Sequence, residues 1–276
     1  MISFPNCKIN LGLNIIRKRA DGYHDLETVF YPIPINDAIE IIAAEKSIAK
    51  DEIRFSSSGL TIDGDTENNL CIKAYKLLKK DFPELPCIKM HLHKAIPMGA
   101  GLGGGSADAA FVLMLLNNKF SLNLSTYQLI NYAQQLGSDC PFFIINKPCF
   151  ATGRGEVLEE INPDLSKYKL VIVNPGIHIN TSWAFAQIQP AASTRPIKEI
   201  VLRSVEQWKD ELKNDFEESV LQHYPELKDL KNTLYQSGAL YTSMSGSGSS
   251  FYGIFKIESM VETKRFPSNY LVRIIG

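Results

Sequence analysis

The stretch PMGAGLGGGSADAA, residues 97–110, places five glycines within nine positions and then continues as a run of helix-forming residues. The preceding residues 87–96 alternate apolar and polar side chains, which predicts a strand, and Ser106 is predicted to cap a helix over residues 106–120. A tight turn needs only one or two glycines, and each further glycine raises the backbone entropy that is lost on folding. The sequence therefore predicts a loop whose exposed N–H groups, together with the start of the helix, bind an anion such as phosphate.

Two other glycine motifs fit this loop less well. Gly99, Gly101 and Gly104 satisfy G-x-G-x-x-G, but a dinucleotide fold also needs a buried strand before the loop and an acidic residue about 20 positions later. The preceding strand is half polar, and residues 109–138 contain no acid. A P-loop would follow its last glycine with Lys and Ser or Thr, whereas Gly105 is followed by Ser-Ala. Both motifs are therefore disfavoured.

Composition limits the classes of partner. The 29 Lys and Arg nearly balance the 30 Asp and Glu of the 276-residue chain, so no positive field is available to hold a nucleic acid. No apolar run is long enough to cross a bilayer, and no signal sequence begins the chain, which predicts a cytoplasmic protein without a membrane partner. The five cysteines are scattered without a C-x-x-C spacing, so neither a disulfide framework nor a zinc site is expected. No heptad pattern assigns an oligomeric state.

Strand and helix patterns alternate along the chain, which predicts an α+β fold in two domains, residues 1–155 and 156–276. Further strands are expected over residues 7–16, 37–45, 138–145, 169–176 and 250–257. Further helices are expected over residues 66–82, 125–137, 182–189 and 197–222. Residues 17–28 are expected to form a loop.

Several polar residues have positions that suit chemistry. Lys8 and Asn10 share one face of the first strand, and Asp139 lies on a loop that leads into an extended run. Lys8 and Asp139 also have purely structural interpretations, because an alternating lysine is usually exposed to solvent and an aspartate on a loop often caps a helix or turn. His91 and His93 share a strand face and would suggest a metal pair, but no third ligand is evident.

The glycine stretch resembles the phosphate-binding motif of the GHMP small-molecule kinases. SMSGSGSSFYG, residues 243–253, is similar to the carboxy-terminal glycine motif of that family. Further segments resemble the branch of the family that phosphorylates a CDP-linked methylerythritol: KINLGL (8–13), RADGYHDLETVF (19–30), LGSDCPFF (136–143), ATGRGEVLE (151–159) and NPGIHINTSWAF (174–185). The resemblance spans nearly the whole chain. It departs at Ala100, where many relatives have a glycine.

The resemblance implies a fold, a reaction and its ligands. The fold would be the two-domain GHMP kinase fold, with an amino-terminal domain like domain 2 of ribosomal protein S5 and a ferredoxin-like carboxy-terminal domain. The reaction would transfer the γ-phosphoryl group of ATP, bound as its Mg²⁺ complex, to the 2-hydroxyl of the CDP-linked methylerythritol. The metal ligands stay unassigned.

The resemblance also implies roles for single residues. Asp139 would orient the attacking hydroxyl or accept its proton, with Lys8 beside it. ATP would contact Asn69 and Leu70 of the adenine segment, which also includes Asn68, as well as Lys94, Pro97, Met98, Gly99, Ala100, Gly101, Leu102, Gly103, Gly104, Gly105 and Ser106. The alcohol substrate would contact Asn10, Tyr23, His24, Phe30, Thr181 and Phe185. Tyr23 and Phe185 would sandwich the cytosine ring, His24 would hydrogen-bond its edge, and Thr181 would approach the diphosphate or the methylerythritol.

Two alternative functions remain open. One is a kinase of the same family for another small alcohol, such as mevalonate, homoserine or a sugar, and a cytidine clamp would argue against it. The other is a nucleotide-binding regulator without catalysis, which the presence of both Lys8 and Asp139 disfavours.

Overall fold

The computed structural model describes residues 1–44, 53–62, 64–191 and 196–276. Its contacts divide the chain into two compact units. Unit 1 comprises Met1–Cys7, Ile33–Met98 and Gly103–Lys147, and unit 2 comprises Lys8–Pro32, Gly99–Leu102 and Pro148–Gly276. The sequence predicts a single boundary after residue 155. In the structure the chain instead passes between the two units several times, including within the glycine loop. The boundary between the two family domains stays a prediction.

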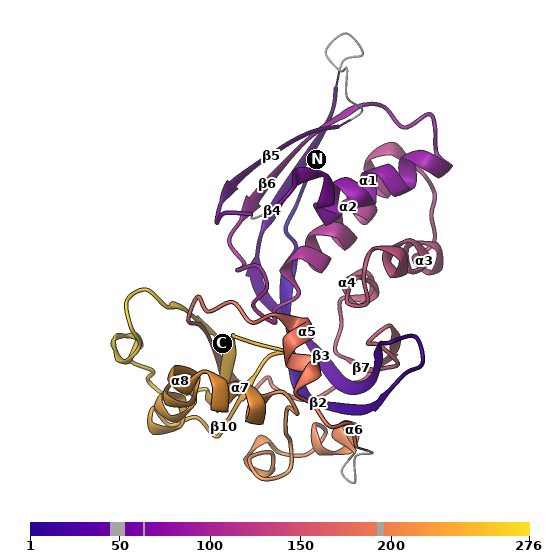
Figure 1. Cartoon of the computed structure of the whole chain (residues 1–276). Coiled ribbons are helices and arrows are strands. Elements are labelled where there is room, and N and C mark those ends of the chain that lie inside the picture. Colours follow the sequence, from indigo (N-terminus) through magenta and orange to yellow (C-terminus); the bar gives the residue numbers. More distant parts are fainter. Residues whose placement is uncertain (45–52, 63, 192–195) are drawn as a thin grey trace. The chain divides into compact units, whose positions relative to one another are not determined.

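Unit 1 contains a four-stranded sheet in the order β1 (Ile2–Ser3), β4 (Ala38–Ala43), β6 (Ile88–Lys94) and β5 (Ile53–Gly59). β5 runs parallel to β6, and the 3₁₀ turn η1 (Thr66–Asn68) and α1 (Leu70–Asp81) connect the two. α1 and α2 (Gly104–Phe120) lie on one face of the sheet (Figure 1). The predicted alternation of β6 is confirmed, since Ile88, Met90 and Leu92 are buried and His93 is exposed. The glycine loop therefore leaves the end of a sheet strand and enters a helix packed on that sheet.

Two further helices, α3 (Thr126–Leu136) and α4 (Cys140–Ile145), lie in the described part of unit 1. α3 begins with the predicted capping box of Ser125 and Gln128. The extended run predicted over residues 138–145 is wrong, because Cys140–Ile145 form the helix α4. The apolar sequence CPFFII has no period that separates a buried strand from a buried helix, and Pro141 stands in the first turn, where proline favours a helix.

A second sheet has the order β2 (Asn6–Lys18), β3 (His24–Asn36), β7 (Cys149–Thr152) and β8 (Val157–Glu160). The loop predicted over residues 17–28 is shorter than expected, since only residues 19–23 connect β2 to β3. β2 is buried on both faces from Asn6 to Leu13, so its polar side chains are buried with its apolar ones. The first strand is therefore not the half-exposed strand that its alternation suggests.

The third sheet lies in unit 2 and is antiparallel throughout, in the order β10 (Tyr241–Met244), β11 (Phe251–Lys256), β9 (Tyr168–Asn174) and β12 (Leu271–Ile275). This is the split strand order expected of a ferredoxin-like arrangement, with the 3₁₀ turn η3 (Thr263–Arg265) between β11 and β12 in place of a helix. α7 (Glu217–His223) and α8 (Pro225–Gln236) precede β10 (Figure 1). The core packs these helices against the sheet through Val171, Val173, Val220, Leu227, Leu230, Leu234, Phe251 and Phe255.

The long helix predicted over residues 197–222 is wrong. This segment contains only the short α6 (Ile197–Ile200), the 3₁₀ turn η2 (Val205–Gln207) and the start of α7. The Leu13 N–H donates to the carbonyl of Lys213, and the Asp215 N–H donates to the carbonyl of Leu13. Because these backbone groups pair with β2, they cannot pair within a helix. The helix predicted over 182–189 is confirmed as α5 (Thr181–Ala186), and the fold class is α+β as predicted.

Candidate functional site

The glycine loop uses left-handed backbone that other residues rarely adopt. Gly99, Gly101 and Gly103 have φ angles of 61°, 76° and 69°. The prediction of Ser106 as the helix N-cap is wrong, because Gly103 occupies that position and α2 already begins at Gly104. Ser106 is therefore the third residue of the helix. The first N–H groups of α2 have no carbonyl of their own helix to pair with, which suits an anion at this point.

The glycine loop packs against the glycine motif of residues 243–253 within unit 2. A Cβ on Gly101 would lie 1.9 Å from the carbonyl oxygen of Ser245, so only glycine permits this approach. The Ser245 hydroxyl donates to the Gly101 carbonyl at 2.7 Å, and the Ser250 N–H donates to the Ala100 carbonyl at 3.2 Å. The two glycine motifs thus form one surface that consists largely of backbone.

Lys8 and Asn10 are buried next to this surface, with 4% and 2% of their area exposed. Lys8 Nζ donates to Asn10 Oδ1 at 2.5 Å and lies 4.8 Å from the centre of the Phe30 ring. Asn10 Nδ2 in turn donates to the Thr28 hydroxyl at 2.9 Å. The Lys8 N–H donates to the Leu102 carbonyl at 3.0 Å, which ties β2 to the glycine loop. The solvent-exposed interpretation of Lys8 is therefore wrong.

Asp139 is half-buried and precedes α4 in unit 1. Its backbone occupies the N-cap position, but its side chain makes no capping hydrogen bond, so capping does not account for an aspartate here. Burial raises the pKa of the neighbouring Cys140 thiol to about 12, although a hydrogen bond with Ser106 opposes this shift. Because Cys140 contacts Ser106, the chain at Asp139 lies beside the first turn of α2.

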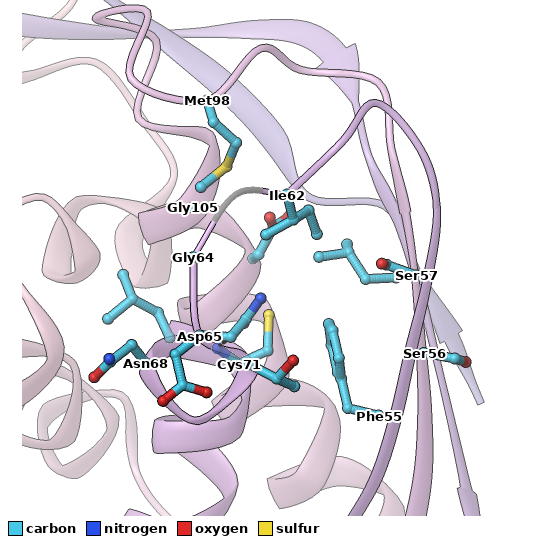
Figure 2. Close-up of a pocket in the computed structure, with 15 residues that line it drawn as sticks. Phe55, Ser56, Ser57, Ile62, Gly64, Asp65, Asn68, Cys71, Met98 and Gly105 are labelled. Atoms are coloured by element: carbon cyan, nitrogen blue, oxygen red, sulfur yellow. Dashed lines mark hydrogen bonds between the residues drawn. The ribbon is translucent and has the colours of Figure 1, made fainter.

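A cavity of about 390 Å³ in unit 1 brings together residues that the resemblance assigns to ATP. Asn68, Asn69 and Leu70 line it from the start of α1, and Met98 and Gly105 line it from the glycine loop and α2. Figure 2 shows the side chain of Met98 turned toward this cavity. The Asn69 side chain also caps α1 by accepting the Cys71 N–H at 2.9 Å. The structure therefore joins the predicted adenine segment to the glycine loop.

Other residues that line the cavity were not predicted from the sequence. Phe55 belongs to β5, and Ile62 follows that strand (Figure 2). Both supply apolar surface of the kind that lines most ligand pockets. The polar run of β5 carried no signal of this role, since the apolar Phe55 stands between Arg54 and Ser56.

Lys94 is buried at the base of the glycine loop, where it contacts two carboxylates and the start of α2. Its side chain is fully buried, forms an ion pair with Asp37, and lies 2.7 Å from Asp108 Oδ2. A Cβ on Gly104 would lie 3.0 Å from Lys94 Nζ, so the ammonium packs directly against the first residue of α2. Direct contact of Lys94 with a nucleotide stays a prediction, and these contacts favour an indirect role.

The predicted cytosine clamp is brought together in part within unit 2. The rings of His24 and Phe185 stack with centres 4.7 Å apart and planes 16° apart, so His24 contacts the ring that was expected to hold the base. Burial lowers the pKa of His24, and Lys18 adds to this effect. Tyr23 is 56% exposed, and the Arg154 guanidinium lies over its ring, 4.9 Å from the ring centre. The aromatic groups are therefore paired with protein neighbours in this structure.

Two residues of the segment NPGIHINTSWAF lie close to the glycine motifs. The Thr181 hydroxyl is 3.2 Å from the Ser247 hydroxyl. His178, to which the sequence assigned no role, would lie 3.0 Å from a Cβ on Gly99. Phe30, predicted to contact substrate, is only 2% exposed, and its ring faces Lys8. A substrate contact of Phe30 stays a prediction.

The histidine pair on β6 has protein partners. His91 Nε2 and His93 Nδ1 both hydrogen-bond the Ser58 hydroxyl, at 2.9 and 3.0 Å. Within the described ranges, no group of three or more His, Cys, Asp or Glu side chains is arranged to hold a metal ion. The same residues include no helix with the length and apolar character that a membrane span requires.

Comparison with known sequences identifies both halves of the chain. The family described as "GHMP kinases N terminal domain" matches residues 69–147, and the family described as "GHMP kinases C terminal" matches residues 196–263. The chain is 51% identical over 270 residues to a 4-diphosphocytidyl-2-C-methyl-D-erythritol kinase of Bacteroides fragilis strain YCH46, covering 98% of this chain and 97% of the relative. It is 52% identical over 257 residues to the enzyme of the same name from Azobacteroides pseudotrichonymphae, with 93% and 94% covered.

Comparison with solved structures points to the same family. A crystal structure of a 4-(cytidine 5'-diphospho)-2C-methyl-D-erythritol kinase superposes with a TM-score of 0.79 at 29% identity, covering 92% of this chain and 90% of the other. A homoserine kinase from Cytophaga hutchinsonii superposes with a TM-score of 0.69 at 14% identity, covering 98% and 94% of the two chains. The second likeness shows the shared fold alone.

Proposed function

The chain belongs to the GHMP kinases, and we propose that it phosphorylates the 2-hydroxyl of 4-diphosphocytidyl-2-C-methyl-D-erythritol with ATP. This is the kinase step of the non-mevalonate pathway to isoprenoid precursors, and relatives that share half of the residues over nearly the whole chain carry the name of this enzyme. The observation that carries the proposal is the contact between Gly101 and Ser245. It joins two glycine motifs into a backbone surface of the kind that binds phosphate.

ATP would bind across the glycine loop, with its base in the cavity lined by Asn68, Asn69 and Leu70. Its phosphates would meet the N–H groups of the loop and of the first turn of α2. Mg²⁺ usually keeps most of its ligands from water and from substrate phosphates rather than from a dedicated protein cage. When bound, it would neutralise charge on the β- and γ-phosphates.

Asp139 and Lys8 are the proposed catalytic residues. Phosphoryl transfer asks the protein mainly to position the reactants and to stabilise developing charge. The Asp139 carboxylate would orient the 2-hydroxyl and accept its proton as the hydroxyl oxygen attacks the γ-phosphorus, whose bond to the bridging oxygen of ADP breaks so that ADP leaves. The Lys8 ammonium, held in one orientation by Asn10 and Phe30, would stabilise the negative charge of the reacting oxygens.

The cytidine end of the substrate would be bound by aromatic residues of unit 2. Phe185 and Tyr23 offer ring faces for stacking, and His24 offers ring nitrogens for the edge of cytosine. Since His24 stacks on Phe185 in this structure, a base on that face of Phe185 would take the place of the imidazole. Thr181 would contact the diphosphate or the methylerythritol. The cytoplasmic location expected from the sequence remains a prediction.

The decisive experiment is an ATP-turnover assay of the purified protein with a panel of alcohols. The panel contains the CDP-linked methylerythritol, the same alcohol without its cytidylyl group, mevalonate and homoserine. We expect ADP release only with the CDP-linked compound, with a new phosphomonoester at its 2-position by ³¹P NMR. Turnover with mevalonate or homoserine instead would support the other-alcohol alternative, and ATP binding without turnover on any alcohol would support the regulator.

A further inference from the structure

Three charged side chains are buried together in unit 1 beneath the glycine loop. Asp37 and Lys94 side chains are fully buried, and the Asp108 side chain is 3% exposed. Lys94 Nζ donates to one oxygen of each carboxylate. One ammonium between two carboxylates leaves a net charge of minus one when all three are ionised. A buried charge without a counterion is strongly disfavoured, so a proton on one carboxylate would relieve this imbalance.

The same three residues hold both ends of the loop. Asp37 Oδ1 accepts the N–H groups of Ala95 and Ile96, at 2.6 and 2.8 Å, where the chain leaves β6. At the other end, Lys94 packs against Gly104, the first residue of α2, and binds Asp108 in the next turn of that helix. A shift in this cluster would therefore move the backbone groups proposed to bind phosphate.

Asp108 is the member that can change its charge. Its Oδ1 is buried and has no hydrogen-bond partner among the described residues. Asp108 also lines the unit 1 cavity in which the base of ATP is proposed to bind. Burial raises the pKa of Asp108 to about 7, with the charge of Asp37 adding to the shift and that of Lys94 opposing it. The third neighbouring group is the Cys71 thiol on α1, whose pKa burial raises well above its usual value, so that it stays neutral.

We propose that Asp37, Lys94 and Asp108 are positioning residues for the ATP site, and that ATP binds more tightly when Asp108 carries a proton. The proposal rests on the function proposed above, because it takes ATP as the ligand of this loop. ATP brings several negative charges to the start of α2, and an ionised Asp108 in that helix would repel them through a medium of low dielectric. Binding would therefore take up one proton from solvent onto Asp108, and no other bond changes.

The test compares the wild-type protein with Asp108→Asn. Lys94 can only donate hydrogen bonds, so the amide must turn its oxygen toward Lys94 and place its NH₂ where Oδ1 stood. Asparagine therefore mimics the protonated carboxyl and balances the charge of Lys94 and Asp37. The variant should fold and should bind ATP as the protonated wild-type protein does.

The measurement is the ATP dissociation constant by calorimetry between pH 6.5 and 8.5, which needs no alcohol substrate. In the wild-type protein we expect the constant to rise by about threefold to tenfold over this range beyond the change seen in Asp108→Asn, as for an interaction between neighbouring like charges. The variant itself reports the titration of ATP alone. Asp215→Asn removes another carboxyl whose pKa burial raises, in unit 2, and should keep the wild-type profile.

The outcomes separate this proposal from the function on which it rests. Identical pH profiles for wild type and Asp108→Asn would overturn the positioning role and leave Asp108 a structural residue. A wild-type dissociation constant that rises more steeply with pH than that of Asp108→Asn, with the wild-type profile kept in Asp215→Asn, supports it. Failure of the wild-type protein to bind ATP at any pH would instead contradict the proposed kinase function.

Discussion

In unit 1 the ends of the glycine loop are held by charged side chains, whereas in unit 2 the middle of the loop is held by neutral groups. Asp37 and Lys94 anchor the chain before the loop and the helix after it. The Ser245 hydroxyl and backbone N–H groups hold residues 100–102. Charged anchors bind strongly but respond to pH, while hydroxyl and peptide groups do not titrate near neutrality. The two units should therefore respond differently to substitution and to pH.

The largest effect should come from Asp139, the candidate catalytic residue of unit 1. Asp139→Asn should lower kcat by about 10²-fold or more, the size of a lost general base. Its melting temperature should stay near that of the wild type, because asparagine has nearly the same size and shape as aspartate. Asp164→Asn, at an exposed turn in unit 2, should leave kcat unchanged. Near-normal turnover of Asp139→Asn would contradict the assignment of Asp139 as the general base.

Substitution of Lys8 tests the catalytic contribution that unit 2 is proposed to make. Lys8→Met keeps an apolar chain against Phe30 and removes the ammonium, so it should lower kcat by roughly 10- to 100-fold while changing KM for ATP by much less. Steady-state kinetics with both substrates varied will show which constant changes. If only KM for ATP rises, then Lys8 contributes to nucleotide binding and not to the reacting group.

Gly101 tests whether backbone contact joins the two glycine motifs. Gly101→Ala would place a methyl group 1.9 Å from the Ser245 carbonyl oxygen, and strain of about 1 to 3 kcal/mol should weaken ATP binding by about tenfold. Gly238→Ala is the matched control, because Gly238 also has a positive φ, of 96°, but no atom lies within 4 Å of its added Cβ. Equal effects of the two substitutions on ATP affinity would show that backbone strain alone matters.

Phe185 tests the aromatic part of unit 2. Stacking of a base on an aromatic ring contributes about 1 to 3 kcal/mol. We expect Phe185→Ala to weaken binding of the CDP-linked substrate by about fivefold, the lower end of that range, because Tyr23 still offers a ring face for stacking. ATP affinity should not change. A large fall in melting temperature with unchanged substrate affinity would instead assign Phe185 to the core, where its ring already meets Phe216 edge-on.

The parts of the site that the sequence predicts well depend on short segments. The glycine motifs, the strand before the loop and the capping box of α3 are local patterns, and the structure contains all of them. The resemblance brought in Asn68, Asn69 and Leu70, which the structure places with Met98 around one cavity. Their roles toward ATP remain predictions.

The parts that sequence reasoning missed depend on contacts between distant segments. Asp37 lies 57 residues from Lys94 in the chain and Asp108 lies 14 residues from it, and no local pattern marks a buried ion cluster. The predicted helix over residues 197–222 failed for the same reason, since Trp208, Leu212 and Phe216 have helical spacing although the backbone nearby pairs with Leu13. Asn214 then donates to the carbonyls of Met244 and Gly246, which places this irregular segment under the second glycine motif.

The smallest expected effect separates the two kinds of anchor by pH. The folded-state pKa of Asp108, about 7, lies above the ordinary value of 3.8, so the folded protein binds more protons than the unfolded chain between these values. Its contribution to the free energy of unfolding therefore falls as pH rises from about 4 to about 7.

Asp108→Asn lacks this titration. From pH 5 to pH 8, its free energy of unfolding, measured with urea, should therefore rise by at least about 1 kcal/mol relative to that of the wild type. Ser245→Ala removes a neutral anchor of unit 2 and should lower the free energy of unfolding by about 1 kcal/mol at both pH values. A difference between wild type and Asp108→Asn that does not change with pH would mean that Asp108 keeps one charge state throughout, and the contrast between charged and neutral anchors would then have no consequence for stability.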